Sequence, residues 1–229
     1  MLGRASLLIF VALACLLHPQ QARAQYGKLY PVDEASQDPS FFVFRARLLL
    51  ALQQRDAGFV LSILSPDVLL SFGGHDGVEE FEKRWQPERP DSPLWNELMV
   101  VLALGGAFRD GGEGRYFAAP YTYTNFLHDG DGGLEAFEAA VSVEENVSVR
   151  REPSANSPLV ATLSFDIVKV ADWEPSQPMD NQQHWVKVAV AEGVEGFVPE
   201  EFLRSPIHYR AVFRKREGRW LLTAFVGGD

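Results

Sequence analysis

The residues best suited to chemistry in the first half of this chain lie in a glycine-rich segment, Gly73-Gly74-His75-Asp76-Gly77. A histidine can transfer protons near neutral pH, and glycines let the backbone approach a ligand closely. The same pattern is also typical of a tight turn, in which the aspartate carboxylate accepts hydrogen bonds from its own backbone. His75 and Asp76 are therefore a candidate pocket, although the pattern favours a turn over catalysis.

Other signatures of catalysis do not occur in the sequence. The glycines follow neither the dinucleotide-binding pattern nor the phosphate-loop spacing, and there is no nucleophile elbow and no H-E-x-x-H motif. The remaining histidines (His128, His184 and His208) are scattered, and Asp129 and Asp131 lack the glutamate that a calcium-binding loop requires. We therefore predict no catalytic residue, no metal site and no cofactor.

Two tryptophans in the second half are candidates for ligand binding. Trp185 falls on the strand face opposite Val186 and Val188. It either lies outside the core as a flat apolar contact for a peptide, or packs beneath the polar insertion 172–183. Trp173, within that insertion, either completes an aromatic groove or anchors the insertion to the strands.

The first 24 residues have the pattern of an export signal. Arg4 supplies a positive charge, an apolar run extends over residues 7–17, and Ala22-Arg23-Ala24 is a cleavage site. The run is shorter than the roughly 20 residues that a membrane-spanning helix needs. We expect cleavage after Ala24, a periplasmic or secreted location and no membrane span in the mature chain. The alternatives are an uncleaved anchor and lipidation of Cys15.

Composition excludes several classes of function. Cys15 is the only cysteine, so a chain cleaved after Ala24 has no disulfide, no catalytic thiol and no cysteine zinc site. The chain has 21 Lys and Arg against 31 Asp and Glu, a net charge of −10, and loss of Arg4 and Arg23 with the signal would make it −12. This charge keeps a protein soluble and disfavours nucleic acids and anionic membranes as partners.

The residues after the signal predict a helical, α+β unit. Asp38-Pro39 has the pattern of a helix start, with Asp as the cap and Pro at the first helical position. Phe41, Phe44, Leu48 and Leu52 follow at helical spacing. Further helices are predicted near 59–64, 78–85 and 93–104, strands over 68–72 and 116–126, and a loose glycine-rich segment over 109–115. Within 116–126, Pro120 must lie at an edge or a break of the strand.

A hairpin is predicted at the end of the chain, with strands over 209–213 and 220–226. The second strand is apolar on both faces, which is typical of a strand that is covered on both sides. A small β-barrel rarely has spare cover. We therefore hypothesise that this hairpin packs under the N-terminal helices, so that the residues between are inserted into one α+β unit.

The residues between these two parts alternate with a period of two and are interrupted by Pro, Ser, Asn and Gly, as in a barrel or sandwich. Segments 146–154, 160–163, 184–188, 195–198 and 201–203 resemble the bacterial SH3-like (SH3b) domains in order and spacing. The resemblance implies a small β-barrel that binds cell-wall peptides or other proteins. Arg151-Glu152 replaces the family's usual small residue and glycine, Phe197 stands where Trp is common, and the insertion 172–183 is long.

Two wider resemblances concern the rest of the chain. Residues 163–170 and the closing segment 218–229 are similar to those of an uncharacterised family of secreted bacterial proteins that contain an SH3b domain. The N-terminal helices and the Gly218-Arg219-Trp220 strand resemble the cone-shaped α+β fold of the ketosteroid isomerase superfamily. The second resemblance implies a pocket within the N-terminal unit.

These patterns together predict an α+β protein in four parts: a signal peptide over 1–24, an N-terminal α+β unit over 25–140, an SH3b-like β-barrel over 141–205, and a hairpin over 206–229 that completes the N-terminal unit. The function that they favour is an exported, non-catalytic binding module that recognises peptidoglycan or an envelope protein. Its expected ligand-binding residues are Trp185, Phe197, Trp173 and Glu152, the last in the loop that commonly edges the family's groove.

Two other functions remain open at this point. One is a periplasmic enzyme or small-molecule binder with a ketosteroid-isomerase-like pocket near His75 and Asp76. The other is a barrel that acts only as a structural brace. Neither the identity of the ligand nor the oligomeric state follows from the sequence.

Overall fold

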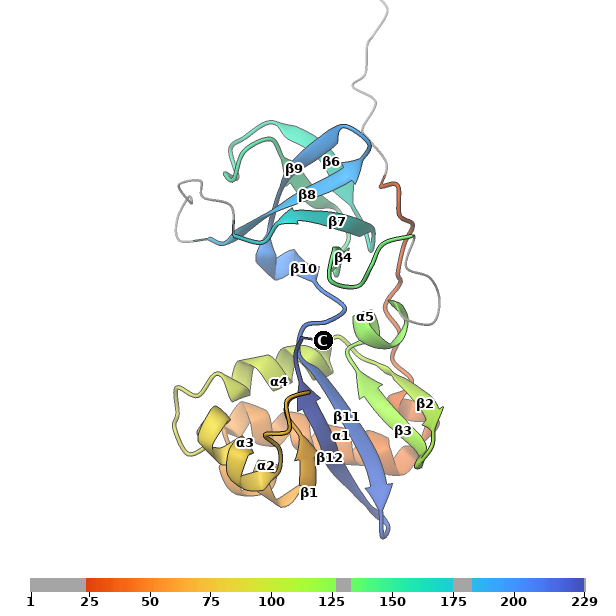
Figure 1. The fold of residues 1–229 in the computed structure, drawn as a ribbon, viewed down its shortest axis with the longest axis vertical. Helices are drawn as coiled ribbons and strands as arrows, with labels where there is room; N and C mark the ends of the chain where they lie inside the picture. The colour runs from red at the N-terminus through yellow and green to blue at the C-terminus, as the bar shows by residue number, and fades with distance from the viewer. Residues whose placement is uncertain (1–23, 127–132, 175–182, 229) are drawn as a thin grey trace, which may run out of the picture.

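A computed structural model describes residues 24–126, 133–174 and 183–228 of the chain. The predictions for the export signal, Cys15, His128, Asp129 and Asp131 concern residues outside these ranges. Within them, no helix is long and apolar enough to cross a membrane. The predicted α+β class is confirmed, because helices and a mixed sheet form one half of the molecule and an antiparallel sheet forms the other (Figure 1).

The first half, here called the helical unit, is built on a five-stranded sheet. Its strands in spatial order are β1 (Leu64–Leu69), β12 (Arg219–Val226), β11 (Arg210–Arg216), β3 (Gly114–Ala119) and β2 (Ala107–Gly111). β1 runs parallel to β12, and the other pairs are antiparallel. The C-terminal hairpin β11–β12 therefore occupies the middle of this sheet, which agrees with the hypothesis that the two ends of the chain form one unit.

Four helices accompany this sheet: α1 (Pro39–Gln54), α2 (Ala57–Ser62), α3 (Val78–Trp85) and α4 (Leu94–Ala103). The 3-10 helix η1 (Ala35–Gln37) precedes α1, and the short α5 (Tyr121–Thr124) follows β3. The predicted start of α1 is confirmed, because an Asp38 carboxylate oxygen accepts hydrogen bonds from the backbone N–H groups of Ser40 (2.8 Å) and Phe41 (3.1 Å). Such a cap satisfies donors that have no partner within the helix.

Several predicted elements of the helical unit were wrong in their bounds. The strand expected over 68–72 is β1, which ends at Leu69, and the helix expected near 59–64 is α2, which ends at Ser62. The segment expected to be loose, 109–115, contains the end of β2, the hairpin turn and the start of β3, and Gly111 pairs with Gly114. The predicted strand over 116–126 ends at Ala119, and Pro120 precedes α5. Proline has no N–H group to continue a strand ladder, so the break at this position has a simple physical reason.

Aromatic rings fill the core of the helical unit. The ring of Phe41 on α1 lies 4.3 Å from that of Phe117 on β3 and 4.9 Å from that of Trp220 on β12. Phe213 on β11 is also fully buried against Phe41. Because these rings come from both ends of the chain, the core forms only when the C-terminal hairpin is in place.

The second half, here called the β-unit, is a seven-stranded antiparallel sheet. Its strands in spatial order are β10 (Leu203–Arg204), β4 (Ala139–Ser142), β7 (Ile167–Asp172), β8 (Trp185–Ala191), β9 (Val194–Pro199), β5 (Val147–Arg150) and β6 (Leu159–Leu163). Between the described strands the ladder is open, with β10 and β6 at its ends. The 3-10 helix η3 (Glu200–Phe202) joins β9 to β10.

The core of the β-unit is formed by side chains that point to one face of the strands, at every second residue. Val147 and Val149 on β5 and Val186 and Val188 on β8 are buried in one cluster, as the period of two predicts. The cluster consists mainly of valine, with alanine and leucine. The core of this half is therefore made of smaller side chains than that of the helical unit.

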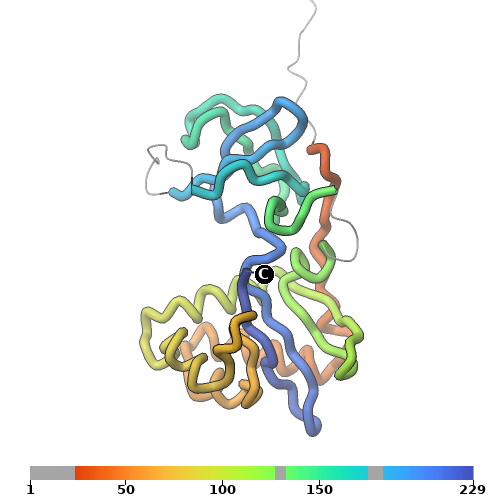
Figure 2. Tube along the Cα trace, viewed as in Figure 1, coloured from red at the N-terminus to blue at the C-terminus, as the bar shows by residue number. Residues whose placement is uncertain are grey.

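The N-terminal segment passes from one half to the other (Figure 2). The N–H group of Gln25 donates to the carbonyl of Val190 (2.9 Å) in the β-unit, and that of Glu34 donates to the carbonyl of Gly106 (2.9 Å) in the helical unit. Residues 203–210 make a second connection, because β10 lies in the antiparallel sheet and β11 in the mixed sheet. The two halves are thus held together by chain segments from opposite ends of the sequence.

Candidate functional site

His75 and Asp76 lie in an exposed loop of the helical unit. The Asp76 carboxylate accepts hydrogen bonds from the backbone N–H groups of Leu70 (2.7 Å) and Ser71 (3.2 Å). The N–H group of His75 donates to the Ser71 hydroxyl (3.3 Å). These are the bonds of a turn, in which the aspartate holds the loop closed. Neither side chain lines any of the cavities described below.

The ketosteroid-isomerase-like pocket expected in the helical unit would need space between α1 and the sheet. That space contains the rings of Phe41, Phe117, Phe213 and Trp220, all of them buried. Interiors packed in this way have few voids larger than a water molecule. These rings form a packed core. At its edge, residues of α1 and α2 and residues 218–221 line a hollow of about 330 Å³, which includes neither His75 nor Asp76.

Trp185 is not the exposed contact that one of its two interpretations requires, because only 3% of the residue is accessible. Around Trp185 lie residues from the start of β5, Pro199, which pairs with it on β9, and Phe202 in η3. With Trp185 these residues line a cavity of about 360 Å³, called here the Trp185 pocket. Most of the insertion under which Trp185 was alternatively expected to pack, residues 175–182, lies outside the described ranges.

The indole nitrogen of Trp185 is a buried hydrogen-bond donor without an acceptor in the described structure. A buried N–H group with no partner costs about 1–3 kcal/mol, so most such groups in proteins are satisfied. The remaining wall of the pocket is polar and charged, and Glu144, Gln183 and Glu201 also line the junction cleft described below. Its other polar residues are Glu145, Asn146, Ser148 and Arg150. The pocket thus combines apolar and polar side chains with a tryptophan whose buried donor has no partner in the described structure.

The other three predicted ligand residues lie outside this pocket. Phe197 is half-buried on β9 and pairs with Lys187, two positions along the ladder from the Trp185–Pro199 pair. Glu152 is exposed in the loop after β5, where its backbone N–H group donates to the Ser157 hydroxyl (2.9 Å). The structure therefore brings neither residue into an aromatic groove with Trp185.

Trp173 lies at the contact between the two halves. Its half-buried ring packs against the core of the β-unit, and its centroid is 5.1 Å from that of the His208 ring. His208 belongs to the segment between β10 and β11. This position matches the interpretation of Trp173 as an anchor.

Sequence reasoning missed a second cavity, called here the junction cleft, which has a volume of about 630 Å³. It lies between α4 of the helical unit and the β10–η3 region of the β-unit. Its lining residues from α4 and the residue after it are Asn96, Glu97, Val100, Ala103 and Leu104. Its lining residues from the β-unit and the segment after it are Val143, Glu144, Gln183, His184, Glu200, Glu201, Leu203, Arg204 and His208.

An ion pair links the two walls of the junction cleft. Arg204 Nη2 lies 2.7 Å from a Glu97 carboxylate oxygen and also donates to the carbonyl of Tyr209 (2.9 Å). The side chain of Arg204 is 10% exposed and that of Glu97 is 26% exposed. Arg204 Nε is buried and has no acceptor in the described residues. No sequence signal could have paired two residues that are 107 positions apart.

His208 borders the same cleft and is uncharged at neutral pH. Burial lowers the pKa of His208 to about 4, with a further lowering by the Arg204 guanidinium that the Glu97 carboxylate opposes. Burial favours the neutral form of an imidazole because the charged form loses its solvation. His208 therefore adds no positive charge to the cleft at pH 7.

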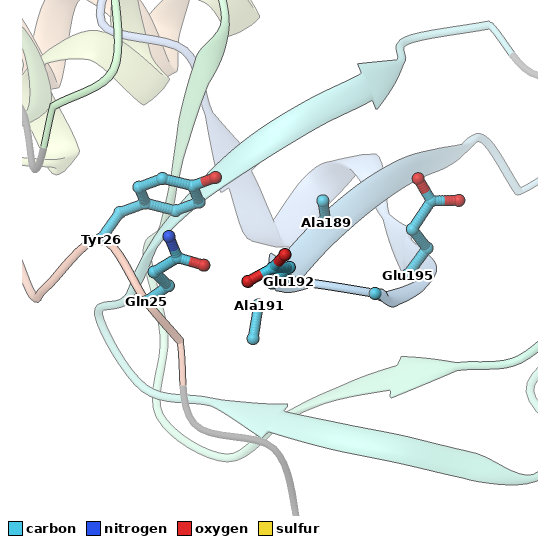
Figure 3. Close-up of a pocket in the computed structure, with 7 residues that line it drawn as sticks. Gln25, Tyr26, Ala189, Ala191, Glu192 and Glu195 are labelled. Atoms are coloured by element: carbon cyan, nitrogen blue, oxygen red, sulfur yellow. The ribbon is translucent and has the colours of Figure 1, made fainter.

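Another hollow, of about 530 Å³, lies beside the β8–β9 hairpin (Figure 3). Gln25 and Tyr26 of the N-terminal segment face Glu192 and Glu195 across it. Glu195 is already paired with Lys187, at an N–O distance of 2.6 Å. Across the described residues, no group of three or more His, Cys, Asp or Glu side chains is arranged to hold a metal ion.

Comparison with known proteins adds no relative. No protein-family model matches the chain, and neither the curated proteins nor the solved structures contain a significant match.

Proposed function

We propose that this protein is an exported, non-catalytic binding module that recognises a peptide chain of peptidoglycan or of an envelope protein. The Trp185 pocket is its binding site, and the β-unit is a barrel of the SH3b kind. The observation that carries the proposal is Trp185, which lines a cavity of about 360 Å³ and whose buried indole N–H has no acceptor in the described structure.

The order of the strands supports the SH3b-like barrel. β7, β8 and β9 form a consecutive antiparallel meander, and β5 pairs with both β9 and β6. A single turn of 3-10 helix, η3, follows β9 and leads into β10. Apart from β7, these elements fall on the segments whose sequences resemble the family. Gly196 sits where an added Cβ would approach the Arg150 carbonyl to 2.7 Å, so β5 and β9 require a glycine there to come this close.

The chemistry of the pocket suits the binding of a peptide. A peptide backbone offers carbonyl oxygens that could accept a hydrogen bond from Trp185 Nε1. Pro199 and Phe202 provide apolar contact, and Gln183 and Asn146 provide further polar groups. The described side chains that line the pocket include no histidine and no cysteine, so they lack the usual pairing of a nucleophile with a base.

The test is co-sedimentation of residues 25–229 with purified cell-wall sacculi. Trp185→Phe removes the indole N–H donor and keeps an aromatic ring. It therefore tests the hydrogen bond to the ligand rather than the packing around Trp185. Trp85→Phe is the matched control, because Trp85 Nε1 is also buried without a partner in the described structure but lies in the helical unit. We expect the parent and Trp85→Phe to bind equally and Trp185→Phe to bind about tenfold more weakly, which is the contribution of one hydrogen bond.

Each other outcome rejects part of the proposal. Equal binding by Trp185→Phe and the parent would mean that the Trp185 pocket is not the site. Failure of the folded parent to sediment with sacculi would remove peptidoglycan as the ligand and leave envelope proteins, to be sought by cross-linking in the periplasm with the same two variants.

A further inference from the structure

The junction cleft has an apolar floor and an acidic rim. Val100 and Leu104 contribute apolar surface from the end of α4. Glu144, Glu200 and Glu201 are exposed and line the cleft from the β-unit. An apolar floor with charges at its edge suits a ligand that is itself a long aliphatic chain ending in a charge of the opposite sign.

The negative charge of this rim is not balanced within the cleft. The one arginine in the lining, Arg204, is already paired with Glu97 at 2.7 Å. Within the described part of the chain, Glu144, Glu200 and Glu201 form no ion pair. The Glu201 carboxylate accepts only a neutral donor, the side-chain amide of Gln183 (3.0 Å).

The C-terminal end of α4 adds to the negative electrostatic potential of the cleft. Val100, Ala103 and Leu104 line the cleft, and α4 (Leu94–Ala103) has no basic residue in its last turn. The C-terminus of a helix carries a partial negative charge from carbonyl groups that have no partner within the helix. A cation placed in the cleft would therefore be attracted from both walls.

Arg204 does not offer a second cation-repelling charge, because it is buried in the wall of the cleft and is already neutralised by Glu97. A polypeptide segment that carries a basic side chain supplies both an aliphatic stem for the apolar surface and a cation for the glutamates.

We propose that the junction cleft binds a lysine or arginine side chain of an extended protein segment. The aliphatic stem lies over Val100 and Leu104, and the cationic group lies among Glu144, Glu200 and Glu201. The inference goes beyond the proposed function because it uses a helix outside the β-unit and does not require Trp185.

The test is calorimetric titration of residues 25–229 with the peptide acetyl-Ala-Ala-Lys-Ala-Ala-amide, and with the same peptide acetylated on the lysine amine. We expect the first peptide to bind and the second to bind at least about tenfold more weakly, because acetylation removes the charge. Binding of the first peptide should also weaken as salt is added.

Three variants locate the site. Glu200→Gln removes one rim charge that lines only this cleft, and should weaken binding about threefold. Ala103→Lys places an amine of the chain itself at the exposed end of α4 and should weaken binding by more than about tenfold, clearly more than the uncharged Ala103→Gln. Glu88→Gln is the control, because it removes an exposed acid of the helical unit that does not line the cleft, and it should bind like the parent.

Equal affinity for the two peptides, or undiminished binding by Ala103→Lys, would overturn the proposal. Tighter binding of a soluble cell-wall stem peptide than of the lysine peptide would also overturn it, because the occupant would then be the wall. Trp185→Phe separates this inference from the proposed function. Retained lysine-peptide binding with weakened sacculus binding supports both, whereas loss of lysine-peptide binding in this variant would show that the cleft is not the site.

Discussion

The two halves of this protein differ in how their cores are built and in where their cavities lie. In the helical unit, large rings such as Phe41, Phe117 and Trp220 interlock between α1 and the sheet. In the β-unit the core consists mainly of valine, and cavities lie around Trp185 and against α4, whereas in the helical unit a hollow of about 330 Å³ lies beside α1 and α2. We therefore expect the aromatic core of the helical unit to contribute more to stability than the valine core of the β-unit.

The two halves also differ in how far apart in the sequence their neighbouring strands lie. The sheet of the β-unit uses strands between Ala139 and Arg204 only. The sheet of the helical unit joins β1 to β12 in parallel and β3 to β11, so it needs residues from both ends of the chain. The β-unit is thus an insertion between two parts of the chain that together form the helical unit.

The largest expected effect concerns the cores. Phe41→Ala should lower the free energy of unfolding by about 4 kcal/mol, because it removes a fully buried ring that contacts rings on β2, β3, β11 and β12. Leu163→Ala, which truncates a fully buried residue of the β-unit core, should cost about 2–3 kcal/mol. Urea denaturation followed by tryptophan fluorescence measures both values. A larger loss for Leu163→Ala would contradict the assignment of stability to the helical unit.

The next effect concerns the link between the halves. Glu97→Ala leaves the Arg204 guanidinium, whose side chain is 10% exposed, without its carboxylate partner. Removal of one partner of a buried ion pair typically costs about 3 kcal/mol, because the remaining charge is desolvated and unpaired. Glu82→Ala, an exposed glutamate of α3, is the control and should change stability little. If the two variants unfold at the same urea concentration, the Arg204–Glu97 pair does not hold the halves together.

The free energy of unfolding should also depend on pH, through His208 in the segment that joins the two halves. The pKa of His208 is lowered from 6.5 to about 4 by burial and by Arg204. The unfolded chain therefore binds a proton at this residue below about pH 6.5, whereas the folded chain does so only near pH 4. The contribution to stability is complete above pH 6.5 and is lost as the pH falls toward 4, a change on the order of 2–3 kcal/mol.

The measurement is the free energy of unfolding of the parent and of His208→Gln at pH 7, 5.5 and 4. We expect the gap between the two proteins to change in favour of the glutamine variant as the pH falls, since glutamine does not titrate. The exposed His75→Gln is the control and should follow the parent at every pH. A constant gap between parent and His208→Gln would show that this imidazole is not kept neutral by the fold.

Much of the fold was predictable because local signals were consistent with tertiary packing. Asp38-Pro39 starts α1, and the alternation of Val186 and Val188 gives a strand with one buried face. The two-sided apolar strand near Trp220 required cover on both faces, which the helical unit provides.

The candidate site was less predictable, because it depends on residues that meet only in the folded chain. Alternation placed Trp185 on the face away from Val186, but could not show that Pro199 and Phe202 would lie around it. The ion pair of Glu97 with Arg204 likewise joins the two halves of the fold, so no local sequence pattern predicts it. His75 and Asp76 were candidate pocket residues because tight turns and catalytic loops contain the same residue types.

The smallest effect tests whether the stability of the helical unit comes from its core or from its helix ends. Asp38→Ala removes the cap of α1, whose carboxylate also has a lowered pKa because of its hydrogen bond with the Ser40 hydroxyl. Loss of a cap typically costs about 1 kcal/mol, well below the cost expected for Phe41→Ala. Asp56→Ala, which removes the cap of the shorter α2, should cost no more. Thermal unfolding of the three variants checks this ranking, and a loss for Asp38→Ala equal to that for Phe41→Ala would move the origin of stability from the aromatic core to the start of α1.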